Sequence, residues 1–202
     1  MESFANTLAA ARSGDSDAAD NLFARVRPWL QILARTQVGR HLQSKSDPSD
    51  VVQIALLEAV GALGQFRGST EAEFLAWLRQ VLANAIRHEA RRYAGTAARD
   101  VTREESLDRE LAESSARMDA GLVAEGSSPS AGVERAETRL ELAALLARLP
   151  DEYRDVIVLR NLEGLSHEEV AERMGRSVGA VRMLWVRALA RLRALTQEKG
   201  ET

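Results

Sequence analysis

The fold of this chain is indicated most directly by residues 165–185, LSHEEVAERMGRSVGAVRMLW. Ser166 followed three residues later by Glu169 is a capping box, the pattern that begins a helix. Gly175 can supply the sharp turn that ends this helix, and Ser177 can cap the next one. Apolar residues at helical spacing predict the inward side of both helices: Val170, Met174, Val181, Trp185, Ala188 and Leu192. The segment therefore predicts a helix-turn-helix whose second helix can enter a major groove.

Charge along the same segment favours a nucleic-acid partner over a helical hairpin without a ligand. Between Arg173 and Lys199 there are seven basic residues and one acid, Glu198, which gives a net charge of +6. In residues 134–172, by contrast, acids outnumber arginines. A basic face of this kind is what phosphate binding requires. The residues that we expect to contact phosphates or bases are Arg176, Arg182, Arg187 and Arg191.

The residues before the motif complete a second domain, predicted over 133–202. Its first helix has Leu140, Ala143, Leu146 and Leu149 on one side, and Pro150 marks the break before a second helix. That second helix contains Val156, Ile157 and Leu162. We expect two short helices, those of the helix-turn-helix, to complete the domain.

A first domain is predicted over residues 1–94. A long helix from Ser16 to about residue 42 has its apolar side at Ala18, Leu22, Val26, Leu30 and Leu33. Asp47 can cap the next helix, Pro48 suits its first position, and Asp50 adds favourable charge near its N-terminus. The predicted buried stripe of that helix is Val52, Ala55, Leu56, Ala59, Val60 and Leu63. A further helix carries Phe74, Trp77, Leu78, Val81, Leu82 and Ile86, and it ends basic at Arg87, Arg91 and Arg92.

Residues 95–132 have the composition of a flexible linker between the two domains. Large apolar residues are sparse, and eight acids against four arginines give a net charge of -4. Thr102 with Glu105 could start a transient helix through Leu107 and Leu111. We interpret the segment as an acidic, solvated tether.

Whole-chain composition limits the remaining choices. The 202 residues are 45% hydrophobic and contain no cysteine, which excludes disulfides and thiolate metal sites. Helical periodicity without period-2 runs predicts an all-α protein. Neither a signal peptide nor a membrane-spanning apolar run is evident, so the expected location is the cytoplasm, without a membrane partner. The net charge of -3, taken alone, would disfavour nucleic acid, but the sum hides the segregation described above.

The ordered set of motifs resembles a bacterial sigma factor of the extracytoplasmic-function (ECF) type. The resemblance rests on residues 47–53 (DPSDVVQ), 66–68 (FRG), 77–78 (WL) and the helix-turn-helix ending in 187–193 (RALARLR). It covers about residues 4–93 and 134–196 and leaves the linker uncovered. Each motif is weak alone, whereas their order and spacing together are specific.

The resemblance implies a transcription initiation factor that binds core RNA polymerase, recognises promoter -35 and -10 elements, and promotes strand opening. It assigns contact with the clamp coiled coil of the polymerase to Asp47, Asp50 and Gln53. The implied -10 contacts are Phe66, Arg67, Ser69, Thr70, Arg79, Asn84, Arg87 and Arg91. The implied -35 contacts are Arg176, Ser177, Val178, Gly179, Arg182, Met183, Arg187 and Arg191. Such factors are commonly held by an anti-sigma protein, which joins core polymerase and promoter DNA among the expected partners.

Two alternatives stay open for the aromatic residues and for Asp50. Phe66 offers a stacking face for an unpaired base if it is exposed, and otherwise it fills the junction between helices. Trp77 and Trp185 lie in apolar stripes, which favours a place in the core. Asp50 could serve the helix N-terminus alone, since its contact with polymerase is implied mainly by the resemblance.

The sequence offers little support for an enzyme and more for a second kind of DNA-binding protein. His41, His88 and His167 are far apart and form no metal-ligand spacing, and no phosphate-binding loop of the G-x-x-x-x-G-K type occurs. We therefore expect no catalysis, no metal and no cofactor. The stronger rival is a helix-turn-helix regulator that binds an operator without being a polymerase subunit. Such a regulator would need neither a core-binding helix nor a single-strand loop in its first domain.

Overall fold

The computed structural model describes residues 3–41, 47–94, 101–120 and 132–200, and every regular element in these ranges is helical. The all-α prediction is confirmed. The first part of the chain forms α1 (Phe4–Arg12), α2 (Ser16–His41), α3 (Pro48–Ala62), the 3-10 turn η1 (Leu63–Gln65) and α4 (Glu71–Ala94). The later part forms α5 (Val101–Ala120), α6 (Gly132–Ala147), α7 (Asp151–Ile157), the π turn η3 (Val158–Leu162), α8 (His167–Met174) and α9 (Val178–Gly200).

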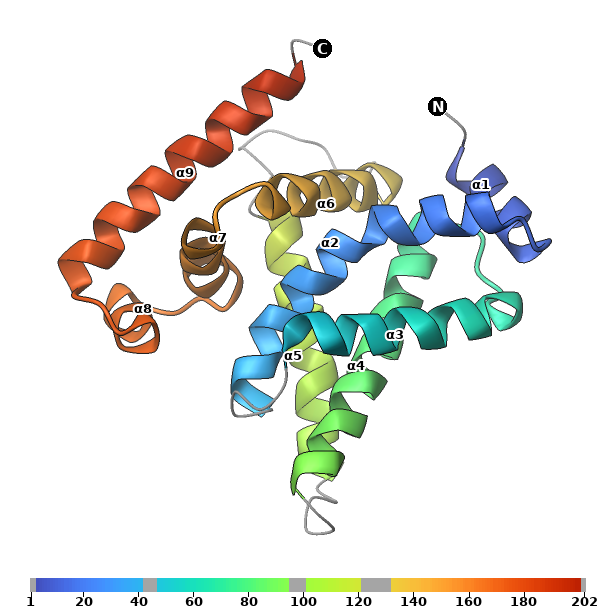
Figure 1. Cartoon of the computed structure of the whole chain (residues 1–202), viewed down its shortest axis with the longest axis horizontal. Helices are drawn as coiled ribbons and strands as arrows, with labels where there is room; N and C mark the ends of the chain where they lie inside the picture. The colour runs from blue at the N-terminus through green and yellow to red at the C-terminus, as the bar shows by residue number, and fades with distance from the viewer. Residues whose placement is uncertain (1–2, 42–46, 95–100, 121–131, 201–202) are drawn as a thin grey trace.

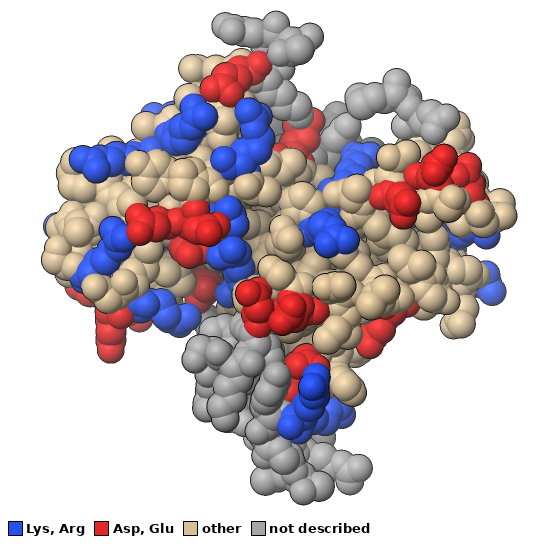
Figure 2. Space-filling view, viewed as in Figure 1, with Lys and Arg blue, Asp and Glu red and all other residues tan. Residues whose placement is uncertain are grey.

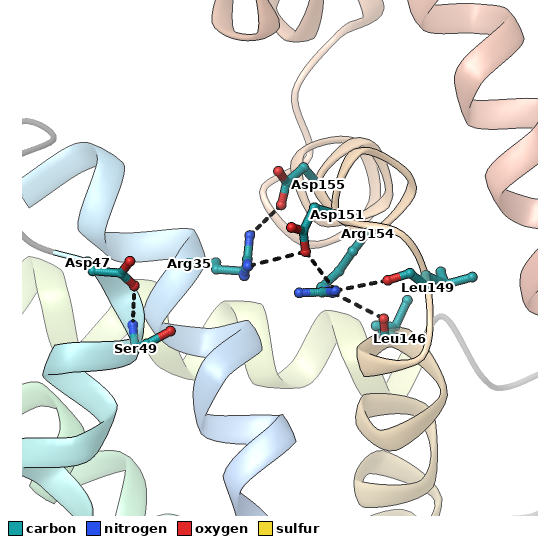
Figure 3. Close-up of polar contacts among 8 residues, drawn as sticks. All are labelled: Arg35, Asp47, Ser49, Leu146, Leu149, Asp151, Arg154 and Asp155. Carbon is teal, nitrogen blue, oxygen red and sulfur yellow. Dashed lines mark hydrogen bonds and ion pairs between the residues drawn. The ribbon is translucent and has the colours of Figure 1, made fainter.

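The helices α1 to α4 form a bundle around the buried side of α2 (Figure 1). Leu22, Val26, Leu30 and Leu33 of α2 are buried as the periodicity predicts. α3 packs against both α2 and α4, and its first turn is capped as expected. The Asp47 carboxylate accepts a hydrogen bond of 2.7 Å from the Ser49 backbone N–H (Figure 3). A single apolar side on each helix is therefore enough to assemble this part of the chain.

One residue of the predicted α3 stripe is exposed to solvent. Val60 is 53% exposed, whereas Val52, Ala55, Leu56, Ala59 and Leu63 are buried. Val60 lies at the edge of a wide apolar sector, and α2 and α4 cover only part of that sector. Periodicity identifies the sector but does not show how much of it the neighbouring helices bury. The assignment of Val60 to the core was wrong.

The segment interpreted as a flexible tether contains a packed helix. α5 contacts α2, α4, α6 and η3, and in Figure 1 it runs beside α4 and behind α2. It buries Leu107, Leu111 and Met118 together with the polar residues Ser114 and Ser115. These few apolar residues lie on one side, so a helix of polar average composition can still dock. The side chains of Thr102 and Glu105, and residues 95–100 and 121–131, lie outside what the structure describes.

The two halves of the chain meet along α2. α6 packs against α2 and α4, and the buried side chains form one continuous cluster that extends from Leu8 to Leu195. Arg35 of α2 reaches α7, where its Nη1 lies 2.6 Å from an Asp155 carboxylate oxygen and its Nη2 lies 3.9 Å from Asp151 (Figure 3). Burial raises the pKa of Asp155, and the positive charge of Arg35 only partly offsets this effect.

The C-terminal half differs from the expectation in the length of its last helix. α7 begins after Pro150, as predicted, and Arg154 holds the preceding break by donating to the carbonyl oxygens of Leu146 and Leu149 at 3.2 and 2.9 Å (Figure 3). α8 is short, but α9 has 23 residues rather than the short helix expected. Its apolar residues continue at helical spacing to Leu195, which is buried, and so no signal ends the helix at the motif.

Candidate nucleic-acid interface

The turn between α8 and α9 has the geometry that its sequence predicts. Ser166 Oγ accepts a hydrogen bond of 3.1 Å from the Glu169 N–H, and the Glu169 carboxylate accepts one of 2.7 Å from the Ser166 N–H. Gly175 has φ 63°, in the left-handed region that favours glycine. The Arg176 N–H then donates to the Ala171 carbonyl oxygen at 2.9 Å. Two helices thus meet at a fixed angle, and the N-terminus of α9 projects from the turn.

The first turns of α9 present one side to solvent. Ser177 caps the helix by accepting a hydrogen bond of 3.2 Å from the Ala180 N–H. Val181, Leu184 and Ala188 are buried, and Val178 is half-buried. The exposed residues on the same stretch include Gly179, Arg182, Met183, Val186 and Arg187. This solvent-facing side of α9 is called the reading side below.

Trp185 lies between the two sides of α9. It is partly buried and packs against the core, and its indole N–H donates to Asn161 Oδ1 at 3.1 Å. The ring of His167 meets it edge-on at 5.6 Å between centroids. These contacts agree with a structural role for Trp185 and join α9 to α8 and η3.

Acidic side chains form ion pairs with most of the arginines of the helix-turn-helix. Arg176 pairs with Glu152, Arg182 lies 3.4 Å from Glu168, and Arg191 lies 3.4 Å from Glu198. Arg182 and Glu168 are 62% and 64% exposed, so this pair is weak and can exchange for a phosphate. Arg187 is exposed, and no carboxylate in the described part of the chain pairs with it. Figure 2 shows the resulting mixture of basic and acidic groups over this part of the surface.

Phe66 fills the junction between helices, which is the second of the two alternatives that the sequence left open, and it offers no exposed stacking face in this structure. It is 8% exposed and stacks on Trp77 at 5.1 Å between ring centroids. Phe74 meets it edge-on at 5.5 Å. The sequence left both readings of Phe66 open because the burial of a loop residue depends on neighbours from distant segments.

The loop from Arg67 to Thr70 is held by the start of α4. The Glu73 carboxylate accepts hydrogen bonds from the backbone N–H of Ser69 at 2.9 Å and of Thr70 at 3.0 Å, and from the Thr70 hydroxyl at 2.9 Å. These bonds lower the pKa of Glu73. The helix N-terminus therefore already holds a carboxylate where a phosphate would otherwise bind. Thr70 is a cap residue, while the side chains of Arg67 and Ser69 are exposed.

The later turns of α4 carry the other residues predicted to contact the -10 element. Asn84 and Arg91 are exposed, and Arg87 donates to Asn84 Oδ1 from the same side of the helix. Arg87 also reaches α5, where its Nη2 lies 2.5 Å from Asp108 Oδ1, and only 13% of its side chain is exposed. Arg79 does not join this group because five residues of helix separate it from Asn84 by about 140°. Arg79 is half-buried, and its predicted contact with the -10 element stays a prediction.

α3 presents a further exposed side that the sequence predicted only in part. Asp50 and Gln53 are exposed there, as expected for a binding role. Leu57 is 68% exposed and Val60 is 53% exposed, and helical spacing places both on the side of Asp50 and Gln53. Asp47, by contrast, uses its carboxylate as the helix cap. The signal for Leu57 was available, since it lies outside the predicted buried stripe.

Family models match both halves of this arrangement. The Sigma-70 region 2 model matches residues 22–96, and the Sigma-70, region 4 model matches residues 139–192. The ECF RNA polymerase sigma factor SigD of Mycobacterium tuberculosis (strain ATCC 25618 / H37Rv) is 31% identical to the chain over 186 residues, which are 92% of this chain and 80% of SigD. The chain belongs to the ECF family of RNA polymerase sigma factors.

The chain is also similar to a further curated relative and to a solved structure. The ECF RNA polymerase sigma-E factor of Escherichia coli (strain K12) is 33% identical to this sigma factor over 177 residues, 88% of this chain and 85% of that protein. A solved structure of CnrH in complex with the cytosolic domain of CnrY is 29% identical, covers 96% of this chain and 97% of that one, and has a TM-score of 0.36. Family membership rests on the sequence matches. The protein is therefore a DNA-binding factor of transcription initiation that recognises promoters, and it belongs with the regulatory subunits of the polymerase.

The matched regions of the sigma factor contain all the surfaces described above. Region 2 contains α3, the loop before α4, and α4 itself, while region 4 contains α8 and the reading side of α9. α1 and α5 lie outside both matches. Within the described ranges, no group of three or more potential ligands could hold a metal ion, and no helix is long and apolar enough to cross a membrane.

Proposed function

We propose that this sigma factor uses three separate surfaces during initiation. The exposed side of α3, formed by Asp50, Gln53, Leu57 and Val60 and called the clamp side here, binds the clamp coiled coil of core polymerase. The loop with Arg67 and Ser69, together with Asn84, Arg87 and Arg91 of α4, holds the melted -10 strand. The reading side of α9 contacts the -35 element. Asp47 and Thr70 support these surfaces as helix caps, and Phe66 does so from the junction between helices.

The observation that carries the proposal is the clamp side of α3. Two large apolar side chains, Leu57 and Val60, are more than half exposed beside the polar Asp50 and Gln53. An apolar centre with polar groups at its edge is the composition of a protein–protein interface. A dimeric helix-turn-helix regulator could use such a surface as well, but the Sigma-70 region 2 match spans this helix and supports polymerase as the partner. The clamp side, together with this match, therefore supports a polymerase subunit rather than a helix-turn-helix regulator that acts without polymerase.

The reading side of α9 supports contact with duplex DNA. Arg182 lies one turn after the small residue Gly179 near the start of the helix, where a helix entering the major groove reaches the base edges, and Arg187 follows five residues later. Met183 is 54% exposed and can contact a thymine methyl group. Arg176 and Arg191, at the two ends of this stretch, are suited to phosphates.

The α4 surface supports contact with a single strand. Arg67, Arg87 and Arg91 supply positive charge along the helix and its preceding loop, and Asn84 adds a donor and an acceptor. Backbone phosphates of an unpaired strand can follow such a row without sequence preference. Base preference would come from the loop, where Arg67 and Ser69 are exposed.

A binding and transcription experiment tests the proposal. The purified protein is mixed with core polymerase, and its affinity is compared with that of Leu57→Ser and of the control Glu58→Gln, which changes an exposed residue of the same helix. Removing the exposed Leu57 should weaken core binding by about tenfold, since a central apolar interface residue contributes more than 1 kcal/mol. Its free energy of unfolding should change by less than about 0.5 kcal/mol, because the side chain is exposed.

Transcript mapping gives the decisive outcome. The wild-type complex should start transcription at defined promoters, whereas core enzyme alone should not. Specific DNA binding by the free protein, without association with core, would instead support the regulator. An anti-sigma protein as a further partner, and the cytoplasm as the place of action, stay predictions of the family resemblance.

A further inference from the structure

The loop between η1 and α4 is fixed from one side by an arginine outside the region 2 match. Arg12 is the last residue of α1, and its Nη2 donates hydrogen bonds to the carbonyl oxygens of both Phe66 and Gly68, the latter at 2.7 Å. The same guanidinium lies over the Phe66 ring, 5.0 Å from its centroid. One cation thus contacts the loop through two carbonyl oxygens and one aromatic face.

The other sides of the loop are equally constrained. Gly68 has no space for a side chain, because a Cβ atom there would lie 2.4 Å from Phe66 Cζ and 2.9 Å from Glu73 Cβ. Phe66 cannot give way easily, since Trp77 and Phe74 hold its ring. Glu73 binds the next two backbone N–H groups. The backbone of residues 66–70 therefore has one conformation that depends jointly on Arg12, Phe66 and Glu73.

Burial makes the Arg12 contact costly to lose. Arg12 is half-buried, and its Nε atom has no hydrogen-bond partner within the part of the chain that the structure describes. Its two carbonyl contacts are charge-assisted, which makes them stronger than bonds between neutral groups. Without Arg12, the Phe66 and Gly68 carbonyl oxygens would lose these donors, and the loop would be free to turn.

We propose that Arg12 is a positioning residue for -10 recognition. It holds the loop so that the exposed side chains of Arg67 and Ser69 face the unpaired strand, and it does so without touching DNA. This inference rests on the proposed function of the loop. It also gives α1 a role in promoter recognition, although α1 lies outside the matched residues 22–96.

The test separates base preference from binding to polymerase. The complex of the sigma factor with core enzyme selects sequences from a single-stranded DNA library randomised at six consecutive positions, and the enriched bases are counted. The variants are Arg12→Gln and Arg12→Lys, with Arg27→Gln as a matched control because Arg27 is exposed on α2. Core affinity and thermal unfolding are measured for each.

The expected result is a flatter base preference at unchanged core affinity. Enrichment by Arg12→Gln should fall about tenfold, the lower end of the range by which one lost charge-assisted hydrogen bond shifts an equilibrium. Arg12→Lys keeps the charge and should restore part of the preference, while Arg27→Gln should match the wild type. If Arg12→Gln does not fold, Gly68→Ala tests the same loop from the other side and should flatten the preference likewise.

Three other results would contradict the inference, and they can be told apart. Wild-type preference retained by Arg12→Gln would leave Arg12 with a purely structural role and the proposed function intact. An absence of any enriched sequence with the wild-type complex would remove the proposed function of the loop, and the inference would fall with it. Lower core affinity in Arg12→Gln, with unchanged base preference, would also count against a positioning role.

Discussion

At the scale of single residues, the protonation state of His167 affects the contact between the two helices of the helix-turn-helix. It is the first residue of α8, and its ring meets Trp185 of α9 edge-on. The Nε2 atom is buried and has no partner in the described part of the chain. Burial lowers the pKa of His167, and the positive charges of Arg160 and Arg182 lower it further. Protonation of this ring therefore opposes the packing of α8 on α9.

We predict that the helix-turn-helix loses stability in mild acid. The unfolded chain binds a proton near the ordinary histidine pKa of 6.5, and the folded chain binds it only at lower pH. The free energy of unfolding should be constant above about pH 7.5 and should fall as pH drops through 6.5 toward the lower folded pKa. Urea unfolding at pH 7.5 and 5.5 measures this change.

His167→Gln should reduce the pH dependence, because it removes the titrating group. His88→Gln is the control, since His88 lies on α4 with 70% of its side chain exposed. Identical pH profiles for the wild type and His167→Gln would assign the acid sensitivity to other groups.

At the scale of elements, α9 combines a buried side that fixes its position with a reading side that is free to bind. Arg187 and Arg193 are both exposed arginines of this helix. Six residues separate them by about 9 Å along the helix axis. Only Arg187 lies in the half of α9 that follows the turn. The two residues therefore distinguish the reading side from the general positive charge of the helix.

We predict that Arg187→Ala weakens promoter binding and that Arg193→Ala has little effect. The loss should be about 1–3 kcal/mol if Arg187 contacts a base, and it should vanish on duplexes without the -35 element. Binding by the complex with core polymerase, measured on duplexes with and without that element, gives the comparison. Equal losses for both variants would point to unspecific attraction to phosphates.

Elements whose signals are local could be predicted from the sequence. Ser166 with Glu169, Gly175 and Ser177 all act within a few residues, and the structure has each of them in its predicted role. The place of Phe66 depended instead on Arg12, Phe74 and Trp77, which only the folded chain brings together. The exposure of Val60 likewise depends on how much of the α3 surface α2 and α4 cover, and only the packed structure shows this. No local sequence pattern indicated that Arg12 contacts this loop.

At the scale of the whole molecule, α5 connects the two halves and covers part of the α4 surface that we propose for the -10 strand. Its Asp108 binds Arg87 of α4, and its Arg117 donates to the Leu162 carbonyl oxygen of η3 at 2.8 Å. The acidic character of this segment could be predicted from its composition, but charge alone could not show that the acid of one helix meets the arginine of another. In this arrangement, Arg87 must leave Asp108 before it can hold a DNA strand.

We predict that Asp108→Asn increases the affinity of the free sigma factor for single-stranded DNA. The ion pair is partly exposed, so the gain should be about two- to fivefold and should shrink at high salt. Fluorescence anisotropy with a labelled oligonucleotide at low and high salt measures it.

Glu113→Gln is the matched control for this prediction, because it removes the same charge from an exposed position of α5. An equal gain from both variants would mean that the overall negative charge of α5, rather than its contact with Arg87, limits binding.

The buried side of α5 contains both apolar and polar residues, and this affects the heat capacity of its docking. Leu107, Leu111 and Met118 are buried together with Ser114 and Ser115. Exposing apolar surface raises the heat capacity, and exposing polar surface lowers it. Release of α5 should therefore change the heat capacity less than release of an all-apolar helix of equal area. The free energy of docking α5 should therefore curve less with temperature than that of an all-apolar helix.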